Sequence, residues 1–296
     1  MRVSFTFYFL QFNLIVGDLF KVKDDYGQYG DLAQDLITWL RSKTHILALL
    51  HELQISTLGK TLSIIRAVLT RWLSHYLVYR RLLDVRPTLE LLITKHEADI
   101  RSTGDARSRA KTSAAIATIR NPTFWHAMAQ WKNLLEPIAL MTNIHQAAHS
   151  KPEHIPISFG FLYYCYSRIG DESDLVARNA VLESAERRWA QVDQEVFIAA
   201  VIVDPLYKDK PFSNIPLTTC AGLMSLFSRL WTRFYGGTPP LELFTDLDNY
   251  LKSLPEFQPL DIYTRILVSC ANDQVICLLE LYSSVSNLFL PTGHTG

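Results

Sequence analysis

The chain has 296 residues, of which 48% are hydrophobic and 20% charged, a composition typical of a globular protein that can bury a sizeable core. Lys and Arg together number 29, as do Asp and Glu, so the formal net charge is zero. This balance excludes attraction to nucleic acid through overall charge, and any such binding needs local basic patches.

The first segment to interpret is residues 1–20, MRVSFTFYFLQFNLIVGDLF. One Arg followed by a mostly apolar run is similar to a signal peptide, but Gln11 and Asn13 interrupt the run and no A-x-A-like cleavage site follows. The run is also shorter than the roughly 20 apolar residues of a membrane span, and no other stretch is apolar enough. We therefore expect neither secretion nor a membrane segment. Residues 4–9, SFTFYF, are one of the few strand candidates.

The next two segments have hydrophobic residues at helical spacing. In residues 31–54 the leucines lie near one face, and Asp31 is suited to cap the helix. Residues 73–93 predict one long amphipathic helix that is strained at Pro87, because proline lacks the amide hydrogen that the helix interior uses.

Three further helical patterns follow along the chain. Residues 121–149 begin with Asn121-Pro122, a helix start signal. Residues 175–203 continue one helical period, including the Ala-rich VFIAAVIV, and end before Asp204-Pro205. Residues 219–237 predict a helix stopped by two glycines. Scarce Gly and Pro, no internal repeat and no low-complexity segment together predict a mainly α protein with a single helical body.

Two segments between the helices are polar. Residues 101–121, RSTGDARSRAKTSAAIATIRN, form the most basic local stretch, which we interpret as an exposed turn that leads into a helix. Residues 205–217 are rich in Pro and Lys and form the clearest internal loop. Neither has the composition of a disordered linker.

Metal-binding and catalytic patterns are weak. His145 and His149 are four residues apart and so share a helical face, with His154 beyond, but Gln146 stands where an H-E-x-x-H motif has Glu. The alternatives are a zinc site and two solvent-exposed helix histidines, and we favour the histidines. No nucleophile elbow and no Gly-rich phosphate loop is present. The carboxylates at 24, 25 and 204 are best explained as residues at helix ends.

Cysteines and aromatic residues also favour ordinary packing. The four cysteines are far apart in sequence and form no C-x-x-C pair, which fits reduced intracellular thiols: Cys165, Cys220, Cys270 and Cys277. Several aromatic residues at helical spacing are expected in the core: Phe161, Tyr163, Tyr164 and Tyr166. Mixed basic and aromatic groups leave open both core packing and stacking on nucleic-acid bases: Arg71-Trp72, Arg80-Arg81 and Arg187-Arg188-Trp189.

Five segments, in the same order as in the family, resemble the C-terminal half of hAT-family transposases, especially the degenerate fungal copies. They are LQFNLIVGDLFK (10–21), TRWLSHYLVYRRLLDVRPTL (70–89), NPTFWHAMAQWKNLLEPIALMTNIHQAAHS (121–150), FGFLYYCY (159–166) and ESAERRWAQVDQEVFIAAVIVDPLYK (183–208). Each motif alone is weak, whereas five in family order over residues 10–210 are specific. Residues 211–296 match only loosely.

The resemblance implies an RNase H-like α/β core interrupted by a large helical insertion domain. Residues 1–60 would hold a remnant of the core with the first helices, residues 61–235 the helical insertion, and residues 236–296 a degenerate C-terminal remnant of the core. We therefore expect the chain to begin inside the family's catalytic core.

The departures from the family pattern argue against catalysis. Family members cleave DNA with two Asp and one Glu that hold divalent metal ions such as Mg²⁺. By resemblance, the first two acids lie upstream of Phe7, and the C-x-x-H pair falls on Phe7 and Leu10. The residue after Cys277, where the third acid is expected, is Leu278, and Glu280 is out of register by two. We expect no catalytic residue, no bound metal and no cofactor.

The resemblance also implies which residues would contact DNA, in the nucleus. Trp72, with Arg71, would stack on a flipped base, or else Trp72 anchors the start of its helix in the core. Arg101, Arg107, Arg109 and Lys111 would contact phosphates, or else form a solvated turn. One alternative function is a protein-interaction or homo-oligomerisation module that uses the apolar residues 275–290. The other is a relic without a selected role.

Overall fold

The computed structural model describes residues 5–22, 25–67, 72–146, 151–212, 217 and 219–262, with the side chains of residues 5–10 and 25–26 left out. The protein is mainly helical, which confirms the predicted fold class at that level, and the described residues contain no β-strand. The finer expectation, a remnant of an RNase H-like core, stays a prediction.

The chain divides into two compact units, not the single helical body that the sequence suggested. Unit 2 is the continuous segment Val16–Leu140, and unit 1 combines Met1–Ile15 with Met141–Gly296. The predicted domain boundaries after residues 60 and 235 follow the resemblance and not the packing, so they stay predictions.

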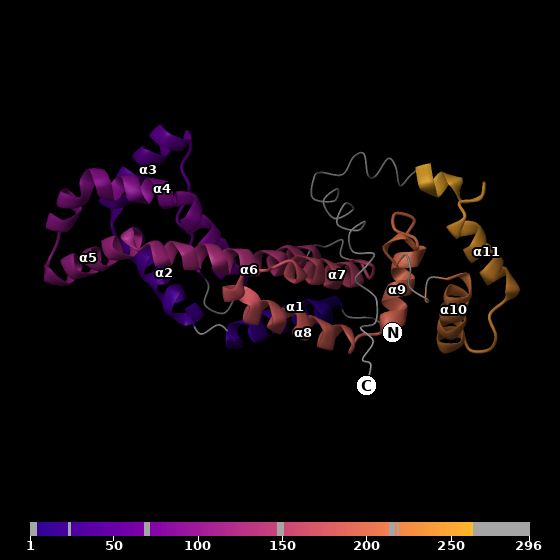
Figure 1. Cartoon of the computed structure of the whole chain (residues 1–296). Coiled ribbons are helices and arrows are strands. Elements are labelled where there is room, and N and C mark those ends of the chain that lie inside the picture. Colours follow the sequence, from indigo (N-terminus) through magenta and orange to yellow (C-terminus); the bar gives the residue numbers. More distant parts are fainter. Residues whose placement is uncertain are drawn as a thin grey trace. The chain divides into compact units, whose positions relative to one another are not determined.

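Unit 2 contains part of α1 (Phe5–Val22), then α2 (Asp25–Ser42), α3 (Thr44–Leu58), α4 (Trp72–Ser102), α5 (Ala106–Arg120) and part of α6 (Pro122–Gln146) (Figure 1). Helix α4 packs against α3 and α5, and α2 packs against α3 and α5. Large side chains such as Tyr79, Trp125 and Trp131 are completely or almost completely buried in this unit. Because such residues bury the most area per side chain, they supply much of the hydrophobic stabilisation.

Unit 1 contains the remaining parts of α1 and α6, then α7 (His154–Ser167), η1 (Glu172–Asp174), α8 (Leu175–Trp189), α9 (Gln194–Val203), η2 (Lys210–Phe212), α10 (Cys220–Tyr235) and α11 (Leu241–Leu251) (Figure 1). Helix α7 packs against α8 and α9, and α9 packs against α10. A second core in this unit includes Val201, Phe212 and Leu226, so the Pro- and Lys-containing loop after α9 contributes apolar residues to packing.

Three sequence predictions were wrong in detail. Residues 5–9 of the strand candidate lie in α1, because the apolar period continues through residue 22. Asp31 is inside α2 and does not cap a helix, and Lys43, with ψ of 89°, separates α2 from α3. The segment 175–203 forms two helices, α8 and α9, because the chain turns at residues 190–193 before α9 begins at Gln194.

Other sequence predictions are confirmed. As predicted, one long helix, the 31-residue α4, includes Pro87. At the predicted start of α6, Asn121 Oδ1 accepts a hydrogen bond of 2.9 Å from the amide of Thr123. Asp204 follows α9, and its carboxylate accepts from the amide of Leu206 at 2.8 Å. Gly236 ends α10 with φ of 74°, a conformation that costs glycine little.

Candidate nucleic-acid interface

The basic stretch 101–121 folds as a tight corner between α4 and α5. Only three residues separate the two helices, and Gly104 adopts φ of +97° to reverse the chain. Asp105 caps α5, because its carboxylate accepts a hydrogen bond of 2.7 Å from the amide of Ser108. The exposed turn leading into a helix, which the sequence predicted, is confirmed.

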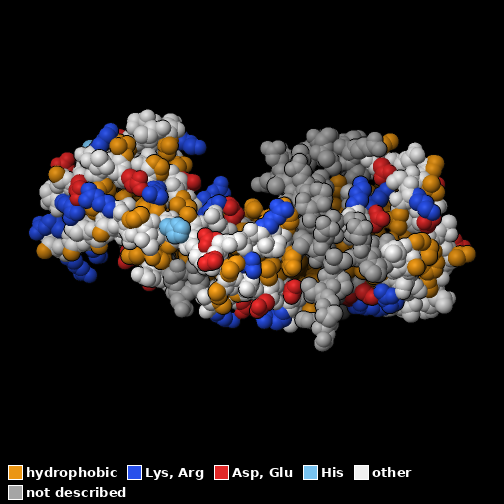
Figure 2. Space-filling model, viewed as in Figure 1, with side chains coloured by type: hydrophobic (Ala, Val, Ile, Leu, Met, Phe, Trp, Pro, Cys, Tyr) orange, Lys and Arg blue, Asp and Glu red, His pale blue; other side chains and the backbone are white. Residues whose placement is uncertain are grey.

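Three cations project from the first turns of α5. Arg107, Arg109 and Lys111 are all exposed, and Figure 2 shows Lys and Arg side chains gathered over the end of unit 2 that holds α5. Arg107 and Lys111 are four residues apart and therefore lie on one helical face. Neither forms an ion pair or hydrogen bond within the described residues. Arg109 donates from Nη1 to the carbonyl of Gly104 at 2.8 Å, a neutral acceptor that leaves its charge uncompensated.

The fourth predicted cation, Arg101, is held by neighbours. Its Nε donates to Glu97 Oε1 at 2.8 Å, and its Nη1 donates to Ser113 Oγ at 3.0 Å. Arg120 also donates to Glu97 Oε1, at 3.2 Å. Hydrogen bonds from Arg101 and then Arg120 lower the pKa of the Glu97 carboxyl. One carboxylate thus pairs with two guanidinium groups, so the cluster of Arg101, Arg120 and Glu97 keeps a net positive charge.

Helix α5 is fixed to α2 beneath these cations. Trp39 Nε1 in α2 donates to the buried hydroxyl of Thr112 at 3.1 Å, and the Lys43 ammonium bonds to the hydroxyl of Ser108. Residues 95–120 hold six basic and three acidic side chains, of which Glu97 is shared by two arginines and Asp105 caps a helix. The corner is therefore a fixed, locally basic surface on a protein without net charge. We call Arg101, Arg107, Arg109 and Lys111 the basic corner.

The structure does not bring Trp72, the other described candidate for a DNA contact, to this corner. Arg71 lies outside the described residues. Trp72 is the half-buried first residue of α4 and already interacts with other parts of the protein. It precedes Arg101 by 29 positions on one helix, which corresponds to about 43 Å at 1.5 Å per residue. Base stacking by Trp72 stays a prediction.

The remaining mixed basic and aromatic groups include packing residues. Arg188 is buried, and Trp189 packs on Phe159 with ring centroids 5.6 Å apart. Phe161 and Tyr166 are buried in α7, as predicted for core residues. Tyr163 and Tyr164 are only partly buried, and the Arg168 guanidinium lies 3.9 Å from the centroid of the Tyr164 ring.

His145 is not the solvent-exposed residue that we expected. Its ring stacks on Phe12 with centroids 5.0 Å apart, and its Nε2 lies 2.8 Å from Ser158 Oγ. Because Ser158 donates its own hydrogen to the carbonyl of His154, it accepts from Nε2 of His145. Burial, and secondarily the charge of His154, lowers the pKa of His145 to about 4. His149 lies outside the described residues, among which no group of three potential metal ligands occurs.

The catalytic candidate of the sequence, Glu280, lies outside the described residues, as do Asp24, Cys270 and Cys277. Of the other two cysteines, Cys165 is partly buried and Cys220 is exposed, and neither forms a disulfide bond within the described residues. No helix in the described part of the chain is both long and apolar enough to span a membrane.

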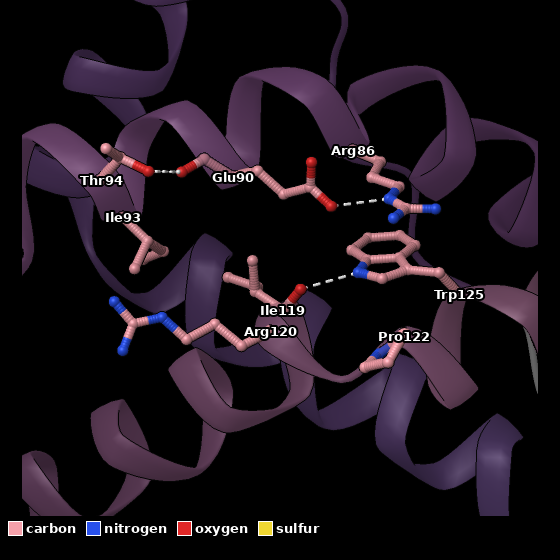
Figure 3. A pocket seen from close by; sticks show the side chains of 8 residues that line it. All are labelled: Arg86, Glu90, Ile93, Thr94, Ile119, Arg120, Pro122 and Trp125. Atoms are coloured by element: carbon pink, nitrogen blue, oxygen red, sulfur yellow. Dashed lines mark hydrogen bonds and ion pairs between the residues drawn. The ribbon is translucent and has the colours of Figure 1, made fainter.

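A cavity of about 240 Å³ near the C-terminal end of α5, away from the cations of its first turns, was missed by the sequence analysis (Figure 3). Its walls come from α4, the end of α5 and the start of α6: Arg86, Glu90, Ile93, Thr94, Ile119, Arg120, Pro122 and Trp125. The only sequence signal is the four-residue spacing of Arg86 and Glu90 across Pro87. That spacing indicates an ordinary surface ion pair on a helix.

Searches of protein-family models, of curated proteins and of solved structures found no match to this chain.

Proposed function

We propose that this chain is a non-catalytic, hAT transposase-derived protein that binds nucleic acid without sequence specificity through the basic corner of unit 2. The family resemblance rests on the five ordered motifs between residues 10 and 210. The proposal includes the remnant of an RNase H-like core and a nuclear location, both implied by that resemblance alone.

The observation that carries DNA binding is the set of exposed cations on the first turns of α5. Arg107 and Lys111 have no partner within the described residues, and Arg109 bonds only to a neutral carbonyl. Phosphate oxygens are suitable partners because each contact releases condensed counterions from the DNA. Arg and Lys side chains can contact phosphate oxygens in DNA of any sequence, and the proposal assigns the corner only such contacts.

The proposal excludes strand cleavage on sequence grounds. Where the resemblance places a C-x-x-H pair, this chain has Phe7 and Leu10, and where it places the third acid it has Leu278. Apolar side chains at those positions cannot bind a divalent cation. Incubation of a labelled oligonucleotide with the pure chain and Mg²⁺ should leave the strand intact, and nicking would contradict this part of the proposal.

Fluorescence anisotropy of a labelled duplex, titrated with protein at several salt concentrations, tests the binding itself. Replacement of Arg107, Arg109 and Lys111 by Gln removes three cations. The negative slope of log K against log salt should therefore become less steep, by about 2.7. Between 50 and 200 mM salt, those three contacts then account for roughly a 40-fold change in affinity. Lys60→Gln, an exposed Lys outside the corner, serves as the control. No binding of the wild-type chain at 50 mM salt would refute the proposal.

A second candidate function, self-association, is favoured by apolar residues near the α10–α11 turn. Phe234, Tyr235 and Leu241 are 54%, 76% and 77% exposed, and a patch of such large apolar side chains would mark an interaction site. If a second copy covers them, light scattering after size-exclusion chromatography should give a dimer that Tyr235→Ser together with Leu241→Ser converts to a monomer. A wild-type monomer at all concentrations would remove this candidate.

A further inference from the structure

The cavity near the C-terminal end of α5 has an apolar floor and a polar rim. Ile93, Ile119 and Trp125 are no more than 2% exposed and form the floor. Figure 3 shows the Arg86 guanidinium over the Trp125 indole, at 5.3 Å from the ring centroid, with Glu90 beside it. The Trp125 Nε1 donates to the carbonyl of Ile119 at 2.7 Å, so the indole itself needs no further partner.

The rim carries donors and an acceptor that have no partner among the described residues. In this part of the chain Arg86 donates only from Nε, to Glu90 Oε1 at 2.7 Å. Within the described residues, the two terminal amino groups of Arg86 and the Oε2 atom of Glu90 have no other hydrogen-bond partner. The two side chains are 41% and 46% exposed, so a ligand can reach them from solvent. A free guanidinium fork thus lies next to a free carboxylate oxygen.

This arrangement matches the pairing edge of a nucleobase. Every base carries a hydrogen-bond acceptor next to a donor on that edge, whereas phosphate and carboxylate groups carry acceptors only. On that edge, a terminal amino group of Arg86 can donate to the base acceptor while the Glu90 carboxylate accepts from the neighbouring amino or imino group of the base. Glu90 would repel an anion, which makes a neutral planar ring the better ligand.

The volume also limits the ligand. A cavity of about 240 Å³ is below the roughly 300–1,000 Å³ of pockets that hold drug-sized molecules, so it suits a single ring system. A base inside a duplex has its pairing edge occupied and its faces stacked. Only an unpaired base can therefore enter, since extrusion from a duplex costs a few kcal/mol.

We infer that this cavity receives one unpaired nucleobase of a strand whose phosphates contact the basic corner. The inference rests on the proposed function and adds a preference for single strands. Arg120 connects the two places, because it lines the cavity and shares Glu97 with Arg101. Figure 3 shows the Arg120 guanidinium extending away from the Arg86–Trp125 pair, so the two arginines serve different places on a strand.

Arg86→Lys tests the inference with the charge kept constant. Lysine preserves the electrostatic contribution and lacks the planar fork. In anisotropy titrations at one salt concentration, the wild-type chain should bind a single strand about tenfold more tightly than the duplex of the same sequence. Arg86→Lys should lose most of that ratio and keep the same salt slope for duplex. Arg80→Lys, an exposed Arg on the same helix, should behave like wild type.

The outcomes separate this inference from the proposed function. Salt-dependent binding with equal affinity for single strand and duplex overturns base binding in the cavity, and so does an unchanged ratio of the two affinities in Arg86→Lys. Either result leaves phosphate binding at the basic corner intact. Absence of any binding at low salt overturns both. A single strand containing 2-aminopurine gives an independent readout. Its fluorescence should rise when the strand binds the wild-type chain, because the base leaves its stack. The rise should be smaller with Arg86→Lys. Circular dichroism verifies that this variant is folded.

Discussion

Acid should destabilise unit 1 through His145. Burial lowers the pKa of this imidazole to about 4, whereas the unfolded chain has the ordinary value of 6.5. The unfolded state therefore binds the proton more readily, and the free energy of unfolding falls as pH decreases from about 6.5 to 4. At 1.36 kcal/mol per pKa unit, the loss amounts to about 3 kcal/mol between pH 7 and pH 4.

His145→Gln isolates this contribution. Glutamine can still donate to Ser158 Oγ but has no proton to gain, so the variant should lose less stability on acidification than wild type by about 3 kcal/mol. Carboxylates titrate in both proteins, so their contribution to the pH dependence of the free energy of unfolding cancels when the two are compared. His126→Gln, which removes an exposed histidine from the same helix α6, is the matched control and should follow wild type.

Urea unfolding at pH 7, 6, 5 and 4, followed by circular dichroism, gives the free energies. The expected pH dependence comes from a buried imidazole that stacks on Phe12 and donates to Ser158. Parallel curves of wild type and His145→Gln across this range would show that His145 titrates normally in the folded protein. That result would refute the burial argument.

Three further substitutions test the helices that hold the corner and α10. Gly104→Ala should destabilise the protein by more than about 1 kcal/mol, as measured by thermal unfolding. Residue 104 has a positive φ, and the added Cβ would lie 2.7 Å from Ser108 Oγ. Thr112→Val keeps the volume but leaves the buried Trp39 Nε1 without its acceptor, and urea unfolding should show a loss of about 1–3 kcal/mol. Thr219→Ala removes the α10 cap and should cost about 1 kcal/mol, and an unchanged midpoint would contradict the capping role.

Local chemistry in the sequence determined the helical class and several helix ends. Apolar residues at helical spacing predicted α4, α6 and α10, while the Asn-Pro start at 121–122 and the glycine pair at 236–237 marked ends correctly. These signals work because they act through neighbouring residues of one helix. The exposed basic turn at 101–121 was predictable for the same reason, since its charges are consecutive in sequence.

Tertiary structure decided everything that depends on residues far apart in the chain. His145 looked like a surface residue until Phe12, more than 130 positions earlier, covered its ring. The cavity combines Arg86 of α4 with Trp125 of α6, and no spacing within one helix reveals such a pair. The sequence alone therefore determined which segments are helical and where positive charge is dense. Packing between helices decided which polar groups are buried, because burial depends on the neighbours that folding supplies.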